Sequence, residues 1–564
     1  MEWEKDCMPS RGSGLSMLLV GLDAACEPVL DRLARDGADL PHLRSILDEG
    51  ASGPLESQVP PWTASAWPSL YTGTNPGKHG VFGFLDFEGY DWDVVNATDV
   101  RERALWELLD SQGLSSVVVN VPVTHPPREF DGALVPGYVA PDDPACHPAG
   151  LLDDVREATG DYRVYPRHTG GGETTTAEKV AEYRDTIRMR GDAFRYLEDR
   201  FAPDFGFVEF QATDTVFHEC PGEFDALRAV YETVDDQVGG ILDACDPATV
   251  IVASDHGIGK YDGYDVRLNT LLRDAGFTET ARGGRGMPSW DVIRDEQFLD
   301  TGDSADEHDE RDGTRSGGGA SVLERAMETA ARAGITSQRV GRVLERLGLA
   351  EVVVRHVPKG MIRAGTEGVD FPASRAYARS HIECGVRLNV AGREPAGVVP
   401  QEEYDAVREA IIEFLSGIET PDGEPAFDDI APREAYFEGG KADRGVDVVV
   451  VPRAFDQFLS TQVRESAFGP PTEPYNHKRD GLIAAAGEAI DADASLAGAH
   501  LFDVAPTVLA SLGLARGEHM DGDVLSIVES VGKRSYPELD EREREATDER
   551  AVEERLSDLG YLQE

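Results

Sequence analysis

Basic residues are scarce in this sequence, and lysine is especially rare. Across 564 residues, 54 lysines and arginines are set against 105 aspartates and glutamates, which leaves a formal net charge of −51. Acidic charge spread along the whole chain, instead of one tail, indicates a surface adapted to high salt, as in an extreme halophile. The same charge argues against a nucleic-acid polymer or an anionic membrane as a partner, because long-range repulsion opposes both.

Cysteine motifs and long apolar runs are also missing. The six cysteines lie far apart without Cys-x-x-Cys spacing, which excludes a zinc finger and a compact disulfide framework. The longest apolar run, near 15–22, is too short to span a bilayer, and the acidic N-terminus lacks the apolar region of a signal peptide. We therefore expect a soluble cytoplasmic protein with a large core and at least one extra module.

Three predicted apolar strands are each followed closely by an aspartate. The pairs are 16–22 with Asp23, 204–211 with Asp214, and 249–254 with Asp255. Continuous apolar runs are typical of buried parallel strands, and ligands of open α/β sheets bind at the carboxyl ends of such strands. One such aspartate alone is better explained as a turn or helix cap. Three at one sheet edge instead predict a cluster suited to divalent metals.

Three histidines accompany these aspartates. His218 lies four residues after Asp214, so the two share one face if this stretch is helical; otherwise His218 is a surface imidazole. His256 follows Asp255 directly, and His477 precedes another apolar segment, although a lone histidine there is more often a loop residue. Mixed aspartate and histidine ligands suit Zn, Mn or Fe.

The segment 58–80 has the most unusual local chemistry in the chain. Pro60 and Pro61 keep the backbone out of the helical region, and the run 63–71 then suits a short helix. Thr63 therefore lies at a helix N-terminus, where unpaired N–H groups favour an anion. There it is either a helix cap, the more common role for a lone threonine, or a nucleophile for a phosphate-like group.

In combination, these motifs resemble the alkaline phosphatase superfamily, and within it the type I phosphodiesterase and nucleotide pyrophosphatase branch. The resemblance spans most of residues 14–530. It also covers Thr72-Gly73, Pro76–Gly80, Asn389–Pro395, Asp480-Gly481, Asp503–Leu509 and Asp521-Gly522. Each motif alone is weak, whereas their order and combination are specific.

The resemblance implies a three-layer α/β/α sandwich around a mostly parallel sheet, with a site for two divalent metal ions. One ion would be held by Asp23, Thr63, Asp255 and His256, and the other by Asp214, His218 and His477. Zn is the expected metal, with Mn and Fe as alternatives. Thr63 would attack phosphorus to form a phosphothreonine, whose hydrolysis restores the starting configuration.

One departure from the family pattern concerns the substrate. Members of the pyrophosphatase branch often place an Asn shortly after the His-Gly pair to bind a phosphoryl oxygen, whereas this chain has Val-Phe-Gly-Phe-Leu at 81–85. Phosphate recognition then falls to Lys78 or a backbone N–H. Because 58–87 contains no arginine and Phe82 to Phe84 supply apolar surface, we predict phosphodiesters or nucleotide pyrophosphates ahead of phosphomonoesters as the small phosphorylated substrate.

Other activities stay open as alternatives. A sulfatase would need Cys or Ser in a Cys/Ser-x-Pro-x-Arg context, which 63–67 lacks. A phosphomonoesterase or a phosphosugar mutase uses the same metal plan, the mutases usually with a serine nucleophile. A phosphotransferase acting on lipid or glycan would normally carry membrane spans. A non-catalytic scaffold is the last alternative, although all seven candidate positions hold competent side chains; the leaving group and the oligomeric state stay open.

The chain order predicts an interrupted core. We expect a catalytic core in two parts, 1–260 and 371–530, separated by an inserted cap at 261–370 that contains a mobile acidic loop. A helix and strands between 375 and 451 are expected to return the chain to this core. A charged helical tail at 531–564 completes the chain.

Overall fold

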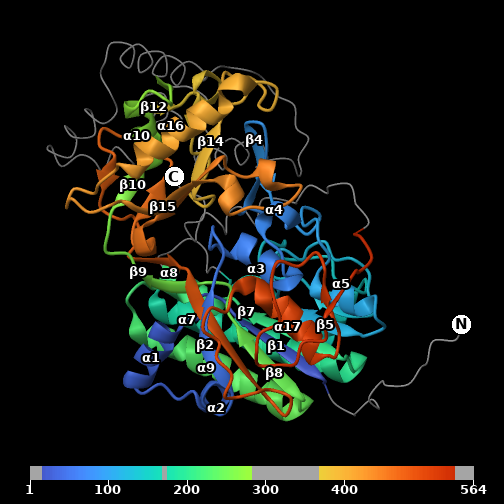
Figure 1. Ribbon diagram of the computed structural model, residues 1–564. Coiled ribbons are helices and arrows are strands. Elements are labelled where there is room, and N and C mark those ends of the chain that lie inside the picture. The colour runs from blue at the N-terminus through green and yellow to red at the C-terminus, as the bar shows by residue number, and fades with distance from the viewer. Residues whose placement is uncertain (1–14, 168–173, 283–366, 540–564) are drawn as a thin grey trace, which may run out of the picture.

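A central seven-stranded sheet organises the computed structural model, which describes residues 15–167, 174–282 and 367–539 (Figure 1). The strand order is β2-β20-β8-β1-β7-β5-β6. The strands are β1 Met17–Leu22, β2 Ala51–Glu56, β5 Ser116–Val119, β6 Gly132–Val135, β7 Phe205–Phe210, β8 Thr249–Ala253 and β20 Asp480–Gly487. Strand β20 pairs antiparallel with β2 and β8, and the other neighbouring strands pair in parallel, which confirms a mostly parallel sheet.

Helices cover both faces of this sheet. One face packs against α1 Glu27–Arg35, α2 Pro41–Glu49, α6 Leu151–Thr159, α7 Thr176–Phe201 and α9 Phe224–Cys245. The other packs against α3 Thr63–Thr72, α5 Leu105–Asp110 and α17 Val504–Ser511. On β1, Leu18 and Val20 belong to the first core, whereas Met17 and Leu19 belong to the second. A strand covered on both faces must be apolar throughout, as the sequence indicated, and the α/β/α sandwich is confirmed.

A second, four-stranded antiparallel sheet lies apart from the central one (Figure 1). Its order is β13-β14-β16-β15, and α16 packs against it. The bounds are β13 Ala376–Tyr377, β14 Gly385–Leu388, β15 Phe427–Pro432, β16 Val448–Pro452 and α16 Tyr404–Ser416. The elements predicted between 375 and 451 therefore exist, but they build this separate sheet, and β20 is the strand that rejoins the central sheet.

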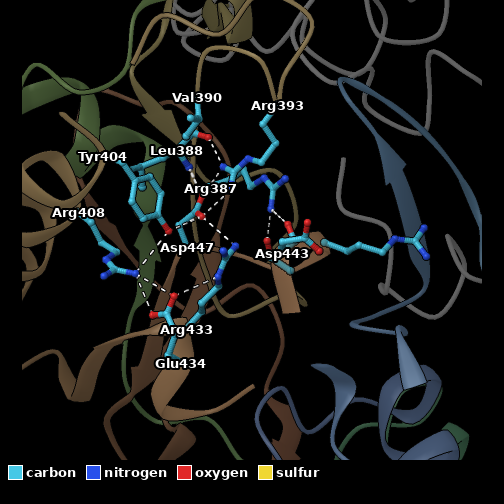
Figure 2. A network of polar contacts seen from close by, with 12 residues as sticks. Arg387, Leu388, Val390, Arg393, Tyr404, Arg408, Arg433, Glu434, Asp443 and Asp447 are labelled. Atoms are coloured by element: carbon cyan, nitrogen blue, oxygen red, sulfur yellow. Dashed lines mark hydrogen bonds and ion pairs between the residues drawn. The ribbon is translucent and has the colours of Figure 1, made fainter. Parts of the chain in front are cut away.

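A buried carboxylate ties the second sheet together. Asp447 accepts hydrogen bonds from the Leu388 N–H at 2.7 Å, both terminal nitrogens of Arg393 at 2.7 and 2.6 Å, and the Tyr404 hydroxyl at 2.9 Å (Figure 2). Arg433 adds an ion pair at 3.2 Å. Burial opposes the charged form, but the bonds and charge of Arg393 lower the pKa of Asp447 to about 2. The charge is thus matched within the protein.

Part of the predicted domain plan lies outside the described residues. Positions 283–366, which include the acidic loop of the predicted cap, and 540–564, which include most of the predicted tail, are among them. The division into core, cap and tail therefore stays a prediction. Over the ranges that the structure does describe, every helix is too short or too polar to cross a membrane.

Candidate metal centre and nucleophile

The three aspartates predicted to meet at one sheet edge do so. Strands β8, β1 and β7 are adjacent in the sheet; Asp255 follows β8, Asp23 follows β1, and Asp214 lies on α8 Ala212–Glu219, directly after β7. All three side chains are buried, with exposed fractions of 0%. Parallel neighbours deliver their carboxyl ends to one edge, so sheet order alone explains the convergence.

Asp23, Asp255 and His256 form the first group of candidate ligands. One oxygen or nitrogen from each lies within 4.8 Å of the others. His256 Nε2 is 3.2 Å from Asp255 Oδ2 and 3.5 Å from Asp23 Oδ1. The other ring nitrogen, Nδ1, is 3.0 Å from the Gly257 carbonyl oxygen and donates to it. In the neutral ring this leaves the Nε2 lone pair facing the carboxylates, the orientation of a metal-bound histidine.

Asp214, His256 and His477 form a second group within the same 4.8 Å limit. His477 Nε2 is 3.7 Å from Asp214 Oδ1, and its Nδ1 is 2.9 Å from the Pro61 carbonyl oxygen, which again directs Nε2 toward the cluster. The rings of His256 and His477 stack with centroids 3.8 Å apart. His256 lies within the distance limit of both groups and so belongs to each. The predicted division had placed it in the first group alone.

His218 joins Asp214 from the same helix. Because α8 is helical, the two side chains share one face, and His218 Nε2 lies 3.3 Å from Asp214 Oδ1. Burial opposes the protonated imidazole, but Asp214 and Glu473 raise the pKa of His218 to about 10. His218 also lowers the pKa of Asp214, against the effect of burial. The sequence predicted that Asp214 and His218 share one face if their stretch is helical, and the structure has them on one helix, α8.

The donor set fits divalent cations. Asp23 Oδ1 and Asp255 Oδ2 are buried and accept no hydrogen bond from the described residues. Within those ranges neither carboxylate pairs with a lysine or arginine. Burial raises the pKa of both, and the charges of Asp255 and Asp214 raise that of Asp23 further. Buried carboxylates without a matching cation are costly, and oxygen and nitrogen donors at this spacing suit metals.

Thr63 lies beside this cluster and does not cap its helix. It is the first residue of α3, whose cap position is Trp62, and no side-chain bond caps that end. Its side chain is buried, with Oγ1 3.3 Å from His256 Nε2. Of the two alternatives for Thr63, the helix cap is therefore wrong, and the role of nucleophile stays a prediction.

Two neighbours of the cluster were missed by sequence reasoning. Trp67 Nε1 donates to Asp23 Oδ2 at 3.3 Å, and Glu473 Oε2 lies 3.5 Å from His218 Nδ1. Trp67 follows Thr63 by four residues on the same helix, so the two side chains share one helix face. The predicted helix at 63–71 could therefore have indicated that Trp67 also faces the cluster. Glu473 lies in an irregular stretch where no periodicity gives a comparable signal.

Two cations near the candidate ligands in sequence bind carboxylates elsewhere. The ammonium group of Lys78 binds the Asp521 carboxylate and donates to the His519 carbonyl oxygen at 2.8 Å. Arg479, a further cation near the ligands in sequence, pairs with Glu56. Neither side chain joins the cluster, so the tentative role of Lys78 in substrate binding finds no support in its contacts.

The phenylalanines at 82 and 84 are core residues. Phe82 packs edge-on against Phe437 with centroids 5.0 Å apart, and Phe84 packs against Tyr138 at 6.0 Å. Their exposed fractions are 6% and 1%. The expectation that they offer apolar surface to a leaving group is therefore wrong, because the surrounding aromatic residues already cover them.

The sequence matches the family model described as type I phosphodiesterase / nucleotide pyrophosphatase over residues 17–346. The chain belongs to this family. It is thus a phosphoesterase of the alkaline phosphatase superfamily, a hydrolase acting on phosphoric ester bonds. A comparison with curated proteins gave no match.

Several solved structures match this chain at low sequence identity. The alkaline phosphatase PafA matches with a TM-score of 0.51 and 14% identity, covering 93% of this chain and 100% of that one. Phosphonoacetate hydrolase from Sinorhizobium meliloti 1021 matches with 0.47 and 16%, covering 88% and 96%. Murine ectonucleotide pyrophosphatase / phosphodiesterase 5 matches with 0.44 and 11%, covering 89% and 96%. At these identities the likeness to PafA shows the fold alone.

Proposed function

We propose that this protein is a metal-dependent phosphoesterase that cleaves phosphodiester or nucleotide pyrophosphate bonds with Thr63 as its nucleophile. One observation carries the proposal: Thr63 Oγ1, at the N-terminus of α3, lies 3.3 Å from His256 Nε2, a member of both candidate ligand groups. A buried hydroxyl between metal donors and a helix N-terminus has the surroundings of an activated nucleophile.

The proposed ligand assignment keeps the division that the family resemblance implies, although His256 lies close enough to join either group. Asp23, Thr63, Asp255 and His256 would hold one divalent ion, and Asp214, His218 and His477 the other. Bound there, the two ions would lower the pKa of a hydroxyl and stabilise charge on a phosphoryl oxygen. Zn is the expected metal, and Mn or Fe would fit the same donors.

The chain's own residues then account for the bond changes. Thr63 Oγ attacks phosphorus, the bond from phosphorus to the leaving oxygen breaks, and the hydroxyl proton is lost to solvent. The N–H groups in the first turn of α3 stabilise negative charge on the phosphoryl group. Water then attacks phosphorus in the phosphothreonine, the bond from phosphorus to Thr63 Oγ breaks, the phosphomonoester product leaves, and Thr63 Oγ regains a proton. Two in-line displacements give net retention of configuration at phosphorus.

The charge around the cluster favours diesters. A monoester dianion carries one more terminal charge than a diester and usually requires a fixed cation beyond the metals. Lys78 and Arg479 bind carboxylates elsewhere, and Lys478, next to His477, binds Asp456 and backbone carbonyls. A small diester or pyrophosphate is therefore the proposed substrate, in place of a nucleic-acid polymer or a membrane. The acidic composition supports a halophilic setting, and a cytoplasmic location is part of the proposal.

Three chromogenic esters test this proposal. The purified protein, in high salt and with added Zn or Mn, is compared on bis-p-nitrophenyl phosphate, p-nitrophenyl phosphate and p-nitrophenyl sulfate. We expect the highest kcat/KM on the diester and loss of turnover after chelation. Higher kcat/KM on the monoester would overturn the diester assignment, and full turnover in excess chelator would overturn metal dependence.

A further inference from the structure

Helix α3 has two buried faces with different chemistry. At 3.6 residues per turn, Thr63 and Trp67 lie on the face directed at Asp23 and His256. Ser65 and Ser69, also four residues apart, lie on the opposite side, and both are fully buried. Buried hydroxyls require partners within the protein, so the back of the nucleophile helix is tied to specific groups.

Those groups form a closed ring of hydrogen bonds. Val81 N–H donates to His79 Nδ1 at 3.2 Å, and His79 Nε2 lies 2.8 Å from Ser69 Oγ. Ser69 donates to the Gln58 side-chain oxygen, and the Gln58 amide nitrogen donates to Ser65. Ser65 donates to the Val81 carbonyl oxygen at 2.9 Å, so the ring begins and ends at one residue, Val81.

All hydrogen bonds of the ring donate in the same direction around it. Because Val81 N–H occupies Nδ1, a neutral His79 carries its proton on Nε2 and donates it to Ser69. Burial lowers the pKa of His79 to about 3, which keeps the ring neutral. Every donor then meets an acceptor through Gln58 and Ser65. Such a chain is satisfied in one arrangement only, because rotating the helix leaves several buried polar atoms unpaired.

We propose that Gln58, Ser65, Ser69 and His79 form a positioning element that fixes the rotation of α3 and so holds Thr63 against the candidate metal centre. The inference rests on the proposed function in taking Thr63 as the nucleophile. It also gives a role to the His79-Gly80 motif, which the candidate metal centre leaves unused. Apolar packing alone tolerates small rotations, whereas a directional ring does not.

Ser69→Ala tests the ring, with Thr72→Val as its matched control. Thr72 is a buried hydroxyl on the same helix that bonds to the Pro68 carbonyl and Thr74, outside the ring. We expect Ser69→Ala to lower kcat by about 10- to 100-fold with KM and bound metal unchanged, because small misplacements of a reacting group are costly. Thr72→Val should lose comparable thermal stability and keep kcat within about twofold.

Crystal structures of both variants give a readout that does not need turnover. The distance from Thr63 Oγ1 to His256 Nε2, 3.3 Å in the native chain, should lengthen in Ser69→Ala and stay unchanged in Thr72→Val. If the native enzyme turns over no ester, the proposed function fails while this comparison still decides the positioning. An unchanged distance in Ser69→Ala, or equal kcat losses in both variants, would overturn the inference.

Gln58→Glu is the second variant should Ser69→Ala not fold. It preserves shape but replaces the amide donor to Ser65 with an acceptor, so the ring loses its direction without a cavity. A protonated Glu restores a donor, and we expect kcat of this variant, relative to the native enzyme, to rise as pH falls. A constant ratio across pH would contradict the ring.

Discussion

Two buried acidic centres in this protein are balanced in opposite ways. Asp447, in the second sheet, is surrounded by Arg393, Arg433 and a tyrosine, and its pKa is held near 2 (Figure 2). Asp23 and Asp255, at the edge of the central sheet, have His256 as their only ion-pair partner among the residues that the structure describes, and their pKa values are raised. The first centre is complete within the protein, whereas the second lacks positive charge, which is the mark of a site for an external cation.

The largest expected effect follows from removing the nucleophile at the incomplete centre. Thr63→Ala should lower kcat at least about 10³-fold, because the attacking oxygen is lost, while bound metal and the unfolding midpoint change little. Thr63→Ser supplies the control, since a hydroxyl remains. Steady-state kinetics on the diester measure both, and near-native turnover by Thr63→Ala would mean that another group attacks phosphorus.

Removing a ligand should lower metal content and activity together. Asp255→Asn and His477→Ala each take one donor from the cluster, and we expect metal affinity to fall about 100-fold. Elemental analysis after dialysis measures the loss. Asp447→Asn is the matched control because it alters a buried carboxylate outside the cluster. Equal metal content in all three variants would contradict the proposed centre.

Asp447→Asn should instead act on stability. A pKa lowered from 3.8 to about 2 corresponds to about 2 kcal/mol of stabilisation at neutral pH, which the amide loses, and Arg393 is left partly unpaired. Urea unfolding at high salt measures the difference, and kcat on the diester should stay near the native value. A large loss of turnover at unchanged stability would show that the two centres are coupled.

The lowered pKa of Asp447 also predicts how its contribution to stability changes with pH. A lowered pKa contributes stability that is fully present above the unfolded value of 3.8 and is lost as pH falls through about 2. The gap in unfolding free energy between the native chain and Asp447→Asn should therefore narrow from pH 4 toward pH 2. A gap that is constant over this interval would show that Asp447 is not charged in the folded protein.

The same contrast explains what sequence reasoning could reach. Asp23 and Asp255 each follow a continuous apolar run directly, so strand pattern and sheet topology together predict their meeting. Asp447 draws its partners from Arg393 and Tyr404, which lie 54 and 43 positions away without a shared periodic pattern. Pairing between short strands that lie far apart in sequence gives no local sequence pattern. The second sheet and its hydrogen-bond network were therefore not predicted.

The substrate-binding role of Lys78 stays a prediction that its contacts with Asp521 and His519 do not support. Lys78 is 15 positions from Thr63, but α3 contains 10 residues and spans about 15 Å, which carries the chain away from the cluster. His79 was predicted only as part of a motif, and its ring of hydrogen bonds joins Gln58, helix α3 and the backbone of Val81. The length of the predicted helix could have been estimated from the sequence, whereas the ring of hydrogen bonds joins segments whose meeting depends on the tertiary fold.

The smallest expected effect concerns Trp67, which donates to the incomplete centre without being a ligand. Its indole N–H lies 3.3 Å from Asp23 Oδ2 and orients that carboxylate. Trp67→Phe removes the donor and part of the ring, so metal affinity should fall about tenfold, as for other groups that orient a ligand. Trp106→Phe is the control, because Trp106 is also buried but packs on Tyr71, with ring centroids 5.1 Å apart. Metal titration followed by calorimetry separates the two variants: both lose packing, but only Trp67→Phe loses a bond to a ligand. Equal metal affinities would mean that the hydrogen bond from Trp67 does not help to orient Asp23 for metal binding. The backbone after β1 would then be sufficient to position this carboxylate.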